Sequence, residues 1–441
     1  MTTLISCFTA SSSLEDVGGG CRRGGTVASD HLKSEGGKCP QPMRVVVFSE
    51  RLWPEGSGGE LATYLILKLL ASAGDFELEV YTGTEDHAKV PGVSIKVVDF
   101  LRASNKVELF TKILANRRLV EKAIERADVV YIPRFSYPVI PIAKKLGKKV
   151  VVHLHDYQPV SYTAVILSSE VERPMSDLKR TFMLEHTSKP LPIALASTLA
   201  SPLTKLIRRW VGAADKIICV SRRHEEILLK LAPEYKGKTI VLYNPLPELP
   251  SIKKNLSEKP VLLYCGGESY VKGFHILLEA LRLLGKKGQT NFKLILTNKY
   301  SQKSLKVVEG LKKKYNLDVQ VLGRIRYEEL LRLHSQTWVL LFPSLWEEPL
   351  PYVILESMIM GTVPISSRLG GVPELLRGTF AEKVLLPPGN YQRIVDYVET
   401  LLSMGRKMLC DFGNELHESA LRRLNNEVIL KSFMQLLVEN H

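Results

Sequence analysis

Two glutamates eight positions apart, Glu348 and Glu356, are the side chains of this chain best placed to do chemistry. An apolar run at residues 338–342 precedes them and predicts a strand, and the turn Pro343-Ser344 follows it. Glu348 should therefore lie at the carboxyl end of a strand, where open α/β sheets bind their ligands.

A helix should begin between the two glutamates. Pro351 suits the first helical position, because its missing N–H is not needed there. The amides of Tyr352 and Val353 would then point out of the helix start, which attracts a phosphate. Glu348 and Glu356 could reach hydroxyls on opposite sides of that phosphate. A phosphate with a polyol at each end is the description of a nucleotide sugar.

This segment resembles the E-x7-E signature of retaining GT-B glycosyltransferases of the GT4-like group, and a Gly-Gly-Val-Pro-Glu sequence at 370–374 continues the resemblance. In that family the first glutamate contacts the donor sugar and the second the nucleotide ribose, which implies these roles for Glu348 and Glu356. The alternative is an ordinary amphipathic helix with two solvated glutamates.

Two glycine-rich loops resemble the same family. Gly58 and Gly59 precede a helical run at 61–70, where backbone amides can approach an anion closely. The resemblance places this loop near the donor phosphates or the acceptor, and a plain strand-to-helix turn is the alternative.

The second loop keeps Lys272 of a diphosphate-binding Arg and Lys pair, but Gly267 stands where the arginine is expected. A charge-assisted hydrogen bond contributes about 1.5–3 kcal/mol, so another base should compensate. Arg324 at a predicted strand end could do so, or could border the nucleotide base. The alternative for Lys272 is a solvated lysine at a helix start.

His155 follows a predicted strand at 150–154 and corresponds to a histidine that GT4-like sequences place near the donor sugar and acceptor. Histidine can donate to a developing oxyanion or orient a hydroxyl. Asp156 could fix His155 or receive the acceptor proton. His153 alternates to the other sheet face and is expected to be a satisfied core histidine.

Alternating apolar and amphipathic runs predict βαβ units in two series, hence an α/β fold with parallel sheets. The resemblance implies GT-B architecture: two Rossmann-like doubly wound domains facing across a cleft. We expect an acceptor domain at 43–245 and a nucleotide-sugar-binding domain at 246–414, with a helix at 415–441 packing back on the first. Residues 1–42, rich in glycine, are expected to be a disordered tail, with Met43 a possible true start.

Composition bounds the partners. The formal charge of +14 favours anionic partners, but no nucleic-acid-binding motif occurs, so nucleic acid is not expected. The sequence contains no run of 18 apolar residues, so no membrane span is predicted. The six cysteines form no Cys-x-x-Cys pair, which fits a cytoplasmic protein. Residues 161–209 contain lysines and arginines together with an apolar run at 191–203. This segment could make a peripheral contact with anionic lipid headgroups. The alternative is helices packed beneath the acceptor side of the first domain.

The leading hypothesis is a retaining hexosyltransferase that uses a nucleotide sugar and a glycan, lipid-linked or small polyol acceptor. His155, Lys272 and Glu348 are the expected catalytic residues. No Asp-x-Asp pair occurs, so no metal and no cofactor are expected. Closure about a hinge at 244–260 would complete the site. The alternatives are a GT-B phosphorylase, a non-hydrolysing epimerase, and a nucleotide-sugar-binding protein without catalysis.

Overall fold

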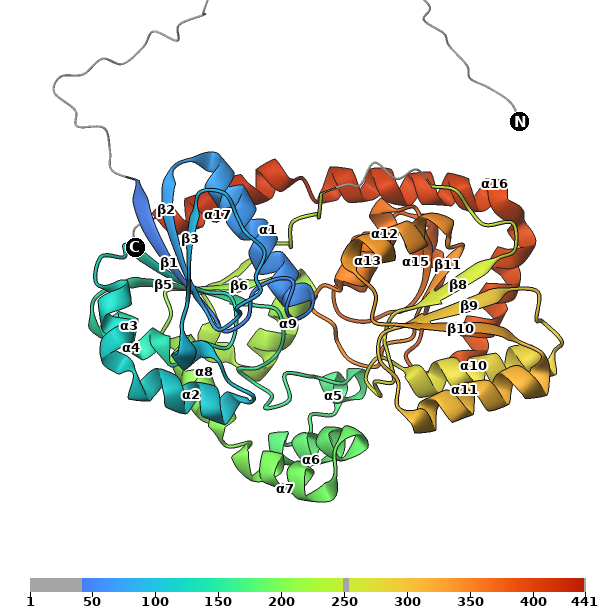
Figure 1. Ribbon diagram of the computed structural model, residues 1–441, viewed down its shortest axis with the longest axis horizontal. Helices are drawn as coiled ribbons and strands as arrows, with labels where there is room; N and C mark the ends of the chain where they lie inside the picture. Colours follow the sequence, from blue (N-terminus) through green and yellow to red (C-terminus); the bar gives the residue numbers. More distant parts are fainter. Residues whose placement is uncertain (1–41, 249–253, 440–441) are drawn as a thin grey trace, which may run out of the picture. The chain divides into compact units, whose positions relative to one another are not determined.

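The structure, a computed structural model, describes residues 42–248 and 254–439 (Figure 1). Nearly all of the tail expected at 1–42 lies outside the described residues, as do residues 440–441 at the end of the chain. None of the described helices is both long and apolar enough to span a membrane.

In the described chain, seven parallel strands form the first sheet, in the order β3-β2-β1-β4-β5-β6-β7. They are β1 (Met43–Ser49), β2 (Phe76–Thr82), β3 (Val93–Val97), β4 (Val129–Ile132), β5 (Lys149–Leu154), β6 (Lys216–Cys219) and β7 (Thr239–Val241). The order reverses between the neighbouring strands β1 and β4, so a crevice opens at their carboxyl ends.

Helices cover both faces of this sheet, which makes the first lobe doubly wound (Figure 1). The helices of this lobe, of which α5 to α7 lie away from the sheet, are α1 (Gly58–Ala73), α2 (Lys106–Ala115), α3 (Arg117–Ile124), α4 (Val139–Lys145), α5 (Ser168–Glu172), α6 (Asp177–Ser188), α7 (Leu191–Ala200), α8 (Leu203–Gly212) and α9 (Arg222–Leu231), with short 3₁₀ turns at Asp99–Leu101 and Pro233–Tyr235. The apolar run at 191–203 is divided between α7 and α8, because Pro202 follows the first helix and precedes the second.

The second described sheet has six parallel strands, in the order β10-β9-β8-β11-β12-β13. Its strands are β8 (Val261–Tyr264), β9 (Lys293–Thr297), β10 (Asp318–Gly323), β11 (Val339–Phe342), β12 (Val363–Ser367) and β13 (Leu385–Leu386). Its helices are α10 (Phe274–Lys286), α11 (Gln302–Tyr315), α12 (Tyr327–Gln336), α13 (Tyr352–Ile359), α14 (Val372–Leu376), α15 (Phe380–Lys383) and α16 (Tyr391–Arg423). The reversal lies between β8 and β11, so this lobe repeats the topology of the first. The predicted fold class, two doubly wound Rossmann-like lobes, is confirmed.

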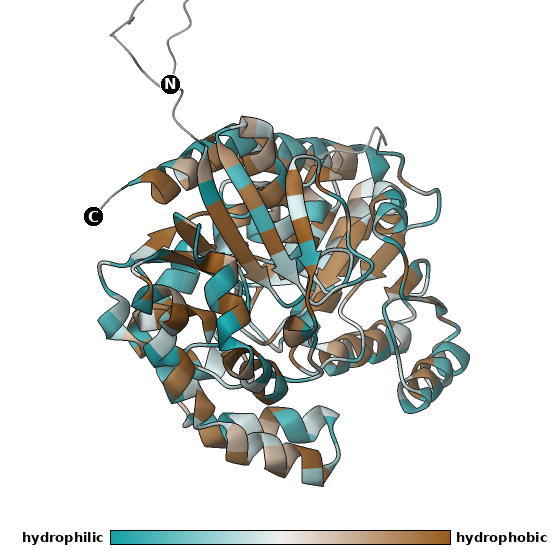
Figure 2. Ribbon diagram, turned by 60° about the vertical axis from the view of Figure 1, so that its left-hand side comes forward, coloured by the Kyte–Doolittle hydropathy of each residue, from teal (hydrophilic) through white to brown (hydrophobic). Residues whose placement is uncertain are grey.

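The chain crosses between the lobes twice in the described residues. The first crossing follows β7, and the second leads from α16, which bends at Gly405, into α17 (Asn426–Val438). Asn426 ties the two crossings together: its side chain accepts from the Leu246 N–H at 2.8 Å and donates to the Leu246 carbonyl at 3.0 Å. Helix α17 lies against the first sheet, where the Phe433 ring packs edge-on against Tyr131. Hydrophobic residues run along much of the strands beneath the covering helices (Figure 2).

Candidate active site

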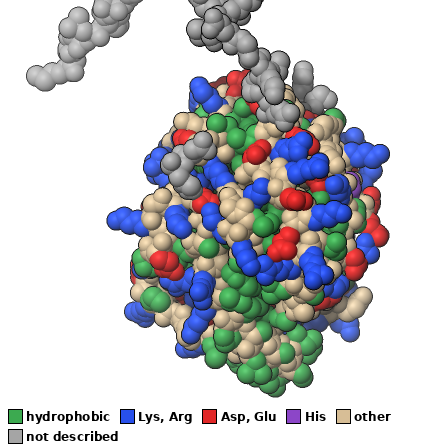
Figure 3. All heavy atoms as spheres, turned by 90° about the vertical axis from the view of Figure 1, so that its left-hand side faces the viewer, with side chains coloured by type: hydrophobic (Ala, Val, Ile, Leu, Met, Phe, Trp, Pro, Cys, Tyr) green, Lys and Arg blue, Asp and Glu red, His purple; other side chains and the backbone are tan. Residues whose placement is uncertain are grey.

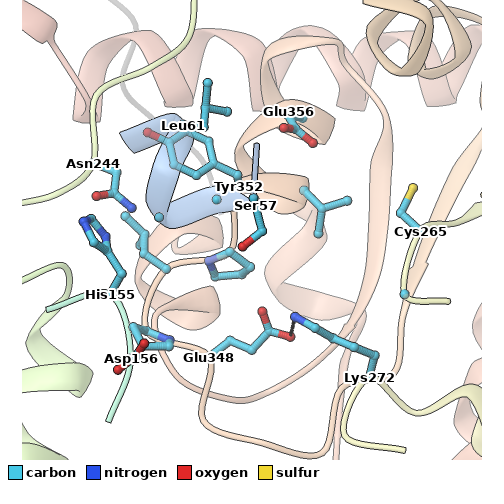
Figure 4. Close-up of a pocket in the computed structure, with 18 of the residues that line it drawn as sticks. Ser57, Leu61, His155, Asp156, Asn244, Cys265, Lys272, Glu348, Tyr352 and Glu356 are labelled. Atoms are coloured by element: carbon cyan, nitrogen blue, oxygen red, sulfur yellow. Dashed lines mark hydrogen bonds and ion pairs between the residues drawn. The ribbon is translucent and has the colours of Figure 1, made fainter. Parts of the chain in front are cut away.

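A cavity of about 590 Å³ opens between the two lobes. Its walls are the loops that leave the carboxyl ends of the central strands of both sheets, where doubly wound folds bind ligands (Figure 4). The predicted residues that line it are Gly58, Gly59, His155, Lys272, Arg324, Glu348, Tyr352, Val353 and Glu356. Gly267 is the predicted site residue that does not line it, although the neighbouring Gly266 does.

Lys272 and Glu348 meet at the lower side of the cavity as drawn in Figure 4. The Lys272 Nζ lies 2.7 Å from Glu348 Oε1, and the Ser344 hydroxyl donates to the same oxygen at 2.9 Å. The Lys272 ammonium also lies 5.4 Å from the centre of the Trp346 ring, a cation–π contact. Glu348 is buried, whereas the Lys272 side chain is one-third exposed, so the ammonium remains open to an anion entering the cavity.

The Gly-Gly-Val-Pro-Glu sequence holds the Glu348 loop in place. The Gly371 N–H donates to the Glu348 carbonyl at 3.0 Å, and the Gly370 N–H donates to Glu347 Oε2 at 2.8 Å. Gly370 has φ +53°, and a Cβ there would lie 1.8 Å from the Glu348 carbonyl oxygen. Only glycine allows this approach, so the motif holds the backbone of Glu348 in place.

Helix α13 begins at Tyr352, with Pro351 as its N-cap at φ −74°. The prediction of Pro351 as the first helical residue is therefore wrong by one position. The Pro351 carbonyl accepts the amides of Ile354 and Leu355, so those of Tyr352 and Val353 come before the first intrahelical bonds, as expected. The Tyr352 hydroxyl donates to the Pro245 carbonyl at 3.0 Å, which fastens this helix start to the first crossing between the lobes.

Glu356, one turn further into α13, points into the upper part of the cavity (Figure 4). Burial raises the pKa of its carboxyl to about 7, since a charge is poorly solvated there. The nearby Tyr327 hydroxyl is buried and has no hydrogen-bond partner in the described chain. A buried carboxyl beside an unsatisfied hydroxyl can bind a diol by both donating and accepting.

The Gly-rich loop of the first lobe is shaped by close packing as well as by any anion. A Cβ on Gly58 would lie 3.2 Å from the Tyr352 ring, and one on Gly59 would lie 2.7 Å from Arg134 Nη1. Both glycines therefore let the start of α1 approach the opposite lobe and Arg134. The two glycines of this loop are therefore explained in part by close packing, apart from any role in binding an anion.

Arg134 lies after β4 and was not predicted. Its guanidinium makes ion pairs with Glu60 at 3.0 Å and with Glu50 at 3.3 Å, and all three side chains are almost fully buried. Burial raises the pKa of Glu50, and the guanidinium partly offsets that shift. Because Arg134 lines the cavity, it adds a cation on the first-lobe side.

His155 lies at the end of β5 on the cavity wall, and its Nε2 is buried with no hydrogen-bond partner in the described chain. Burial, together with the neighbouring His153 and Arg134, lowers the pKa of His155 well below its usual value, so the ring is neutral. The rings of His153 and His155 are tilted relative to each other, with their centroids 4.2 Å apart. The Nδ1 of His153 is hydrogen-bonded to the Tyr131 hydroxyl, but its Nε2 has no partner in the described chain, so His153 is only half satisfied. The Asp156 carboxylate accepts the Gln158 N–H at 2.9 Å, and the described hydrogen bonds include none from Asp156 to the His155 ring.

Four buried polar atoms without a protein partner line this one cavity. They are His155 Nε2, Tyr327 Oη, Trp346 Nε1 and Asn244 Oδ1. Buried polar groups in folded proteins are nearly always hydrogen-bonded, so these atoms indicate a polar ligand rich in hydroxyls. The sequence interpretation missed Tyr327 and Trp346, which have no motif of their own, and treated Asn244 only as part of a hinge.

The family described as "Glycosyltransferase Family 4" matches residues 56–247. The family described as "Glycosyl transferases group 1" matches residues 247–417. The boundary between the two matches falls at the first crossing between the lobes.

Known proteins with the same arrangement share little sequence. The glycogen synthase of Mycobacterium tuberculosis is 26% identical over 241 residues, which cover 52% of this chain and 56% of that protein. Sucrose-phosphate synthase from Thermosynechococcus elongatus superposes with a TM-score of 0.66 at 18% identity, covering 89% of this chain and 98% of that one. Anabaena Alr3699/HepE in complex with UDP-glucose gives 0.61 at 17% identity, covering 90% and 99%. The chain spans about half the length of the curated relatives it matches.

Proposed function

The chain belongs to the GT4-like glycosyltransferases of the GT-B fold, and from that premise we propose that it transfers a hexosyl group from a nucleotide sugar to an acceptor hydroxyl. The observation that carries the proposal is the convergence of Lys272, Glu348 and Glu356 with four unpaired polar atoms in one interlobe cavity. Neighbouring structures that hold UDP-glucose support a donor of this class.

The donor would lie with its diphosphate between Lys272 and the start of α13. The ammonium and the amides of Tyr352 and Val353 supply positive potential there without needing to reorganise. Glu348 accepts hydrogen bonds from hydroxyls of the sugar. Glu356 and Tyr327 together accept hydrogen bonds from the ribose hydroxyls and donate hydrogen bonds to them. Arg324, exposed at the end of β10, replaces the arginine that is absent at Gly267.

The chemical step follows from this placement. The acceptor oxygen bonds to the anomeric carbon as the bond from that carbon to the diphosphate oxygen breaks, and the leaving nucleoside diphosphate takes the electron pair. The acceptor oxygen attacks from the face that the diphosphate leaves, so the anomeric configuration is retained, and its proton passes to a phosphate oxygen on that face. Neutral His155 donates a hydrogen bond from Nε2 to a sugar or acceptor hydroxyl.

Metal independence is part of the same proposal. In this proposal, Lys272, the helix-start amides and Arg324 stabilise the charge that develops on the leaving group.

The acceptor is proposed to be a glycan, a lipid-linked sugar or a small polyol. The matched proteins bear the names of a glycogen synthase, a sucrose-phosphate synthase and a sulfoquinovosyl transferase. We place the activity in the cytoplasm, with peripheral contact to a membrane as part of the proposal.

A donor panel tests the function. The purified chain is incubated with UDP-, GDP- and ADP-hexoses, with and without acceptors, and release of the nucleoside diphosphate is measured. We expect acceptor-dependent release from one donor and a product of unchanged anomeric configuration by NMR. Lys272→Gln should abolish most of that release, whereas Lys303→Gln on the outer helix α11 should not. Donor binding without release would instead identify a binding protein, and release that requires inorganic phosphate would identify a phosphorylase.

A further inference from the structure

Helices α6 and α7 form a pair that projects from the first lobe (Figure 1). The side of α7 that is buried carries small residues, Ala194 and Thr198. Its outward side carries Leu191, Leu195 and Leu199 at intervals of four, and Leu199 is 80% exposed. A soluble surface helix normally has the opposite arrangement, with its large apolar residues inside. Folding therefore leaves Leu199 largely exposed, and Leu191 and Leu195 about half exposed.

The exposed apolar residues continue onto both neighbouring helices. This apolar face consists of Leu178, Phe182, Leu191, Ile193, Leu195, Leu199 and Leu206. Figure 3 shows hydrophobic side chains gathered at the lower end of the molecule, where α6 and α7 lie, with Lys and Arg side chains above them. No charged residue occurs between Lys189 and Lys205. A contiguous apolar patch of this kind marks a binding surface.

The border of the apolar face is cationic. Residues 173–212 contain seven Lys or Arg and two Asp or Glu, and both acids are held in ion pairs within the same segment. Four exposed bases make no ion pair in the described chain: Arg173, Lys179, Lys205 and Arg209. The face therefore combines apolar anchors with unneutralised positive charge.

We propose that the α6–α7 pair docks the protein on an anionic lipid bilayer. Leucines enter the boundary between headgroups and acyl chains, while the lysines and arginines contact anionic headgroups. A second copy of this chain is a poorer occupant, because it would bring the same cationic border against itself in a protein that already carries +14.

The docking face is connected to the wall of the cavity. The Asp177 carboxylate at the start of α6 accepts the Tyr162 N–H at 3.0 Å, and the following residues 163–165 line the cavity. The Ser168 N–H donates to the Leu345 carbonyl of the second lobe at 3.0 Å. Docking would thus hold the first-lobe wall near the bilayer. Resting on the proposed function, this selects an acceptor whose hydroxyl is presented at a lipid surface.

Vesicle flotation of the full chain tests the docking. We expect binding to phosphatidylcholine vesicles that contain phosphatidylglycerol and none to phosphatidylcholine alone, with binding lost at high salt. Leu195→Ser/Leu199→Ser should weaken the partition by at least about tenfold. Lys179→Gln/Lys205→Gln should weaken it about fivefold per lysine.

Two matched controls fix the location. Leu119→Ser removes a leucine that is 55% exposed on α3, and Lys303→Gln/Lys306→Gln removes two exposed lysines on α11, so both should bind like the unaltered chain. Equal binding to neutral vesicles, or equal loss in the controls, would overturn the proposal. A dimer in solution that the Leu195→Ser/Leu199→Ser variant dissociates, with no vesicle binding, would identify a second copy as the occupant instead.

Catalysis is measured separately, so that the two proposals can fail independently. The leucine variant should release nucleotide with a soluble acceptor at the unaltered rate, yet glycosylate a polyol headgroup in anionic vesicles more slowly than the same headgroup in detergent. Vesicle binding without nucleotide release from any donor would refute the proposed function and leave the docking intact. Equal rates on vesicles and in detergent would refute the assignment of a lipid-surface acceptor.

Discussion

Lys272 and Glu348 form a 2.7 Å ion pair in the interlobe cavity, with the ammonium partly open and the carboxylate buried. An incoming diphosphate can bind that ammonium while a sugar hydroxyl binds the carboxylate, so each charge keeps a partner when the donor is bound. The pair would thus hold the two groups in position before binding.

We expect Lys272→Gln to lower kcat/KM by about 10- to 100-fold, because a charge-assisted hydrogen bond contributes about 1.5–3 kcal/mol. The matched control is Lys259→Gln, which breaks the exposed 2.7 Å ion pair with Asp318 on the outer surface. Steady-state kinetics with the preferred donor make the comparison. Equal effects of the two variants would exclude a role for Lys272 in the donor site.

Glu356 gives the site a pH dependence with a defined sign. Burial raises the pKa of this carboxyl to about 7, so it binds a proton in the folded protein at a pH where the unfolded chain is ionised. The stability it contributes is present below about pH 4.5 and is lost as pH rises to about 7. Donor binding should instead strengthen as the pH rises, because the ionised carboxylate of Glu356 binds the ribose hydroxyls best.

Glu356→Gln should therefore raise the free energy of unfolding at pH 8 by up to about 3 kcal/mol, and the unfolding temperature should rise with it. Both quantities should be nearly unchanged at pH 4.5. We also expect the donor KM of the unaltered chain to rise between pH 8 and pH 6, and this rise should be absent in the variant. Thermal unfolding and donor titrations at several pH values measure both effects. A variant that is destabilised at pH 8 would contradict the assigned sign.

Sequence reasoning found the residues that carry motifs and missed those that do not. Glu348, Glu356 and Lys272 are recognisable by spacing, and the structure brings them to one cavity. Trp346 and Tyr327 are ordinary aromatic residues in sequence, and only their orphaned polar atoms mark them. Arg134 could not be predicted from the sequence, because its ion-pair partners, Glu50 and Glu60, are distant from it in the chain.

At the scale of elements, the loop that carries Glu348 depends on the turn at 370–371. Gly370 is at φ +53° and packs against the backbone carbonyl of Glu348, so this turn fixes the backbone that carries the carboxylate. This explains why the Gly-Gly-Val-Pro-Glu sequence accompanies the spaced glutamates.

Gly370→Ala should destabilise the protein by about 2 kcal/mol or more and reduce turnover with it, because the new Cβ is forbidden both by φ and by contact. Gly310→Ala is the matched control: it lies inside α11 with open space around it, and the change should stabilise by about 1 kcal/mol. Thermal unfolding and donor turnover are measured for both. A Gly370→Ala variant with unaltered turnover would show that the turn does not position Glu348.

Element prediction succeeded where a strand is buried and missed the edge strands β3, β7 and β13, although the edge strand β10 was predicted. The central strands β1, β5, β8 and β11 are apolar runs because both of their faces are covered. The edge strands β3 and β7 contain no fully buried residue, so their sequences show no such run. The short β13 has two residues and could not be recognised by pattern.

The whole molecule is two lobes whose relative position the site requires. Glu374 of the second lobe accepts the amides of Arg222 and Arg223 at the start of α9 and the Tyr243 hydroxyl, at 2.7–3.0 Å. Beside it, the Ser221 hydroxyl donates to the Pro349 carbonyl at 2.6 Å. These contacts join the lobes next to the cavity, but the Glu374 side chain itself does not line the cavity. The sequence predicted a hinge but not this contact, which depends on tertiary packing.

Glu374→Gln should slow transfer several-fold while leaving the Kd for the nucleoside diphosphate within about twofold, because a helix N-terminus prefers a charged carboxylate by about 0.3–1 kcal/mol. Glu382→Gln removes a comparable 2.7 Å bond from the Gly378 amide within the second lobe alone and serves as the control. Turnover and nucleotide titration are compared. Slowing by both variants alike would mean that stability, rather than the interlobe contact, limits turnover.

The central claim is that one nucleoside diphosphate is bound between the lobes by Lys272 and the start of α13, with Glu356 on its ribose. A crystal structure of the chain with the diphosphate of its preferred donor tests this most directly. We predict phosphate oxygens within hydrogen-bonding distance of Lys272 Nζ and the Tyr352 and Val353 amides, and ribose hydroxyls on Glu356. A nucleotide bound outside this cavity, or inside it with its phosphates away from Lys272, would contradict the account.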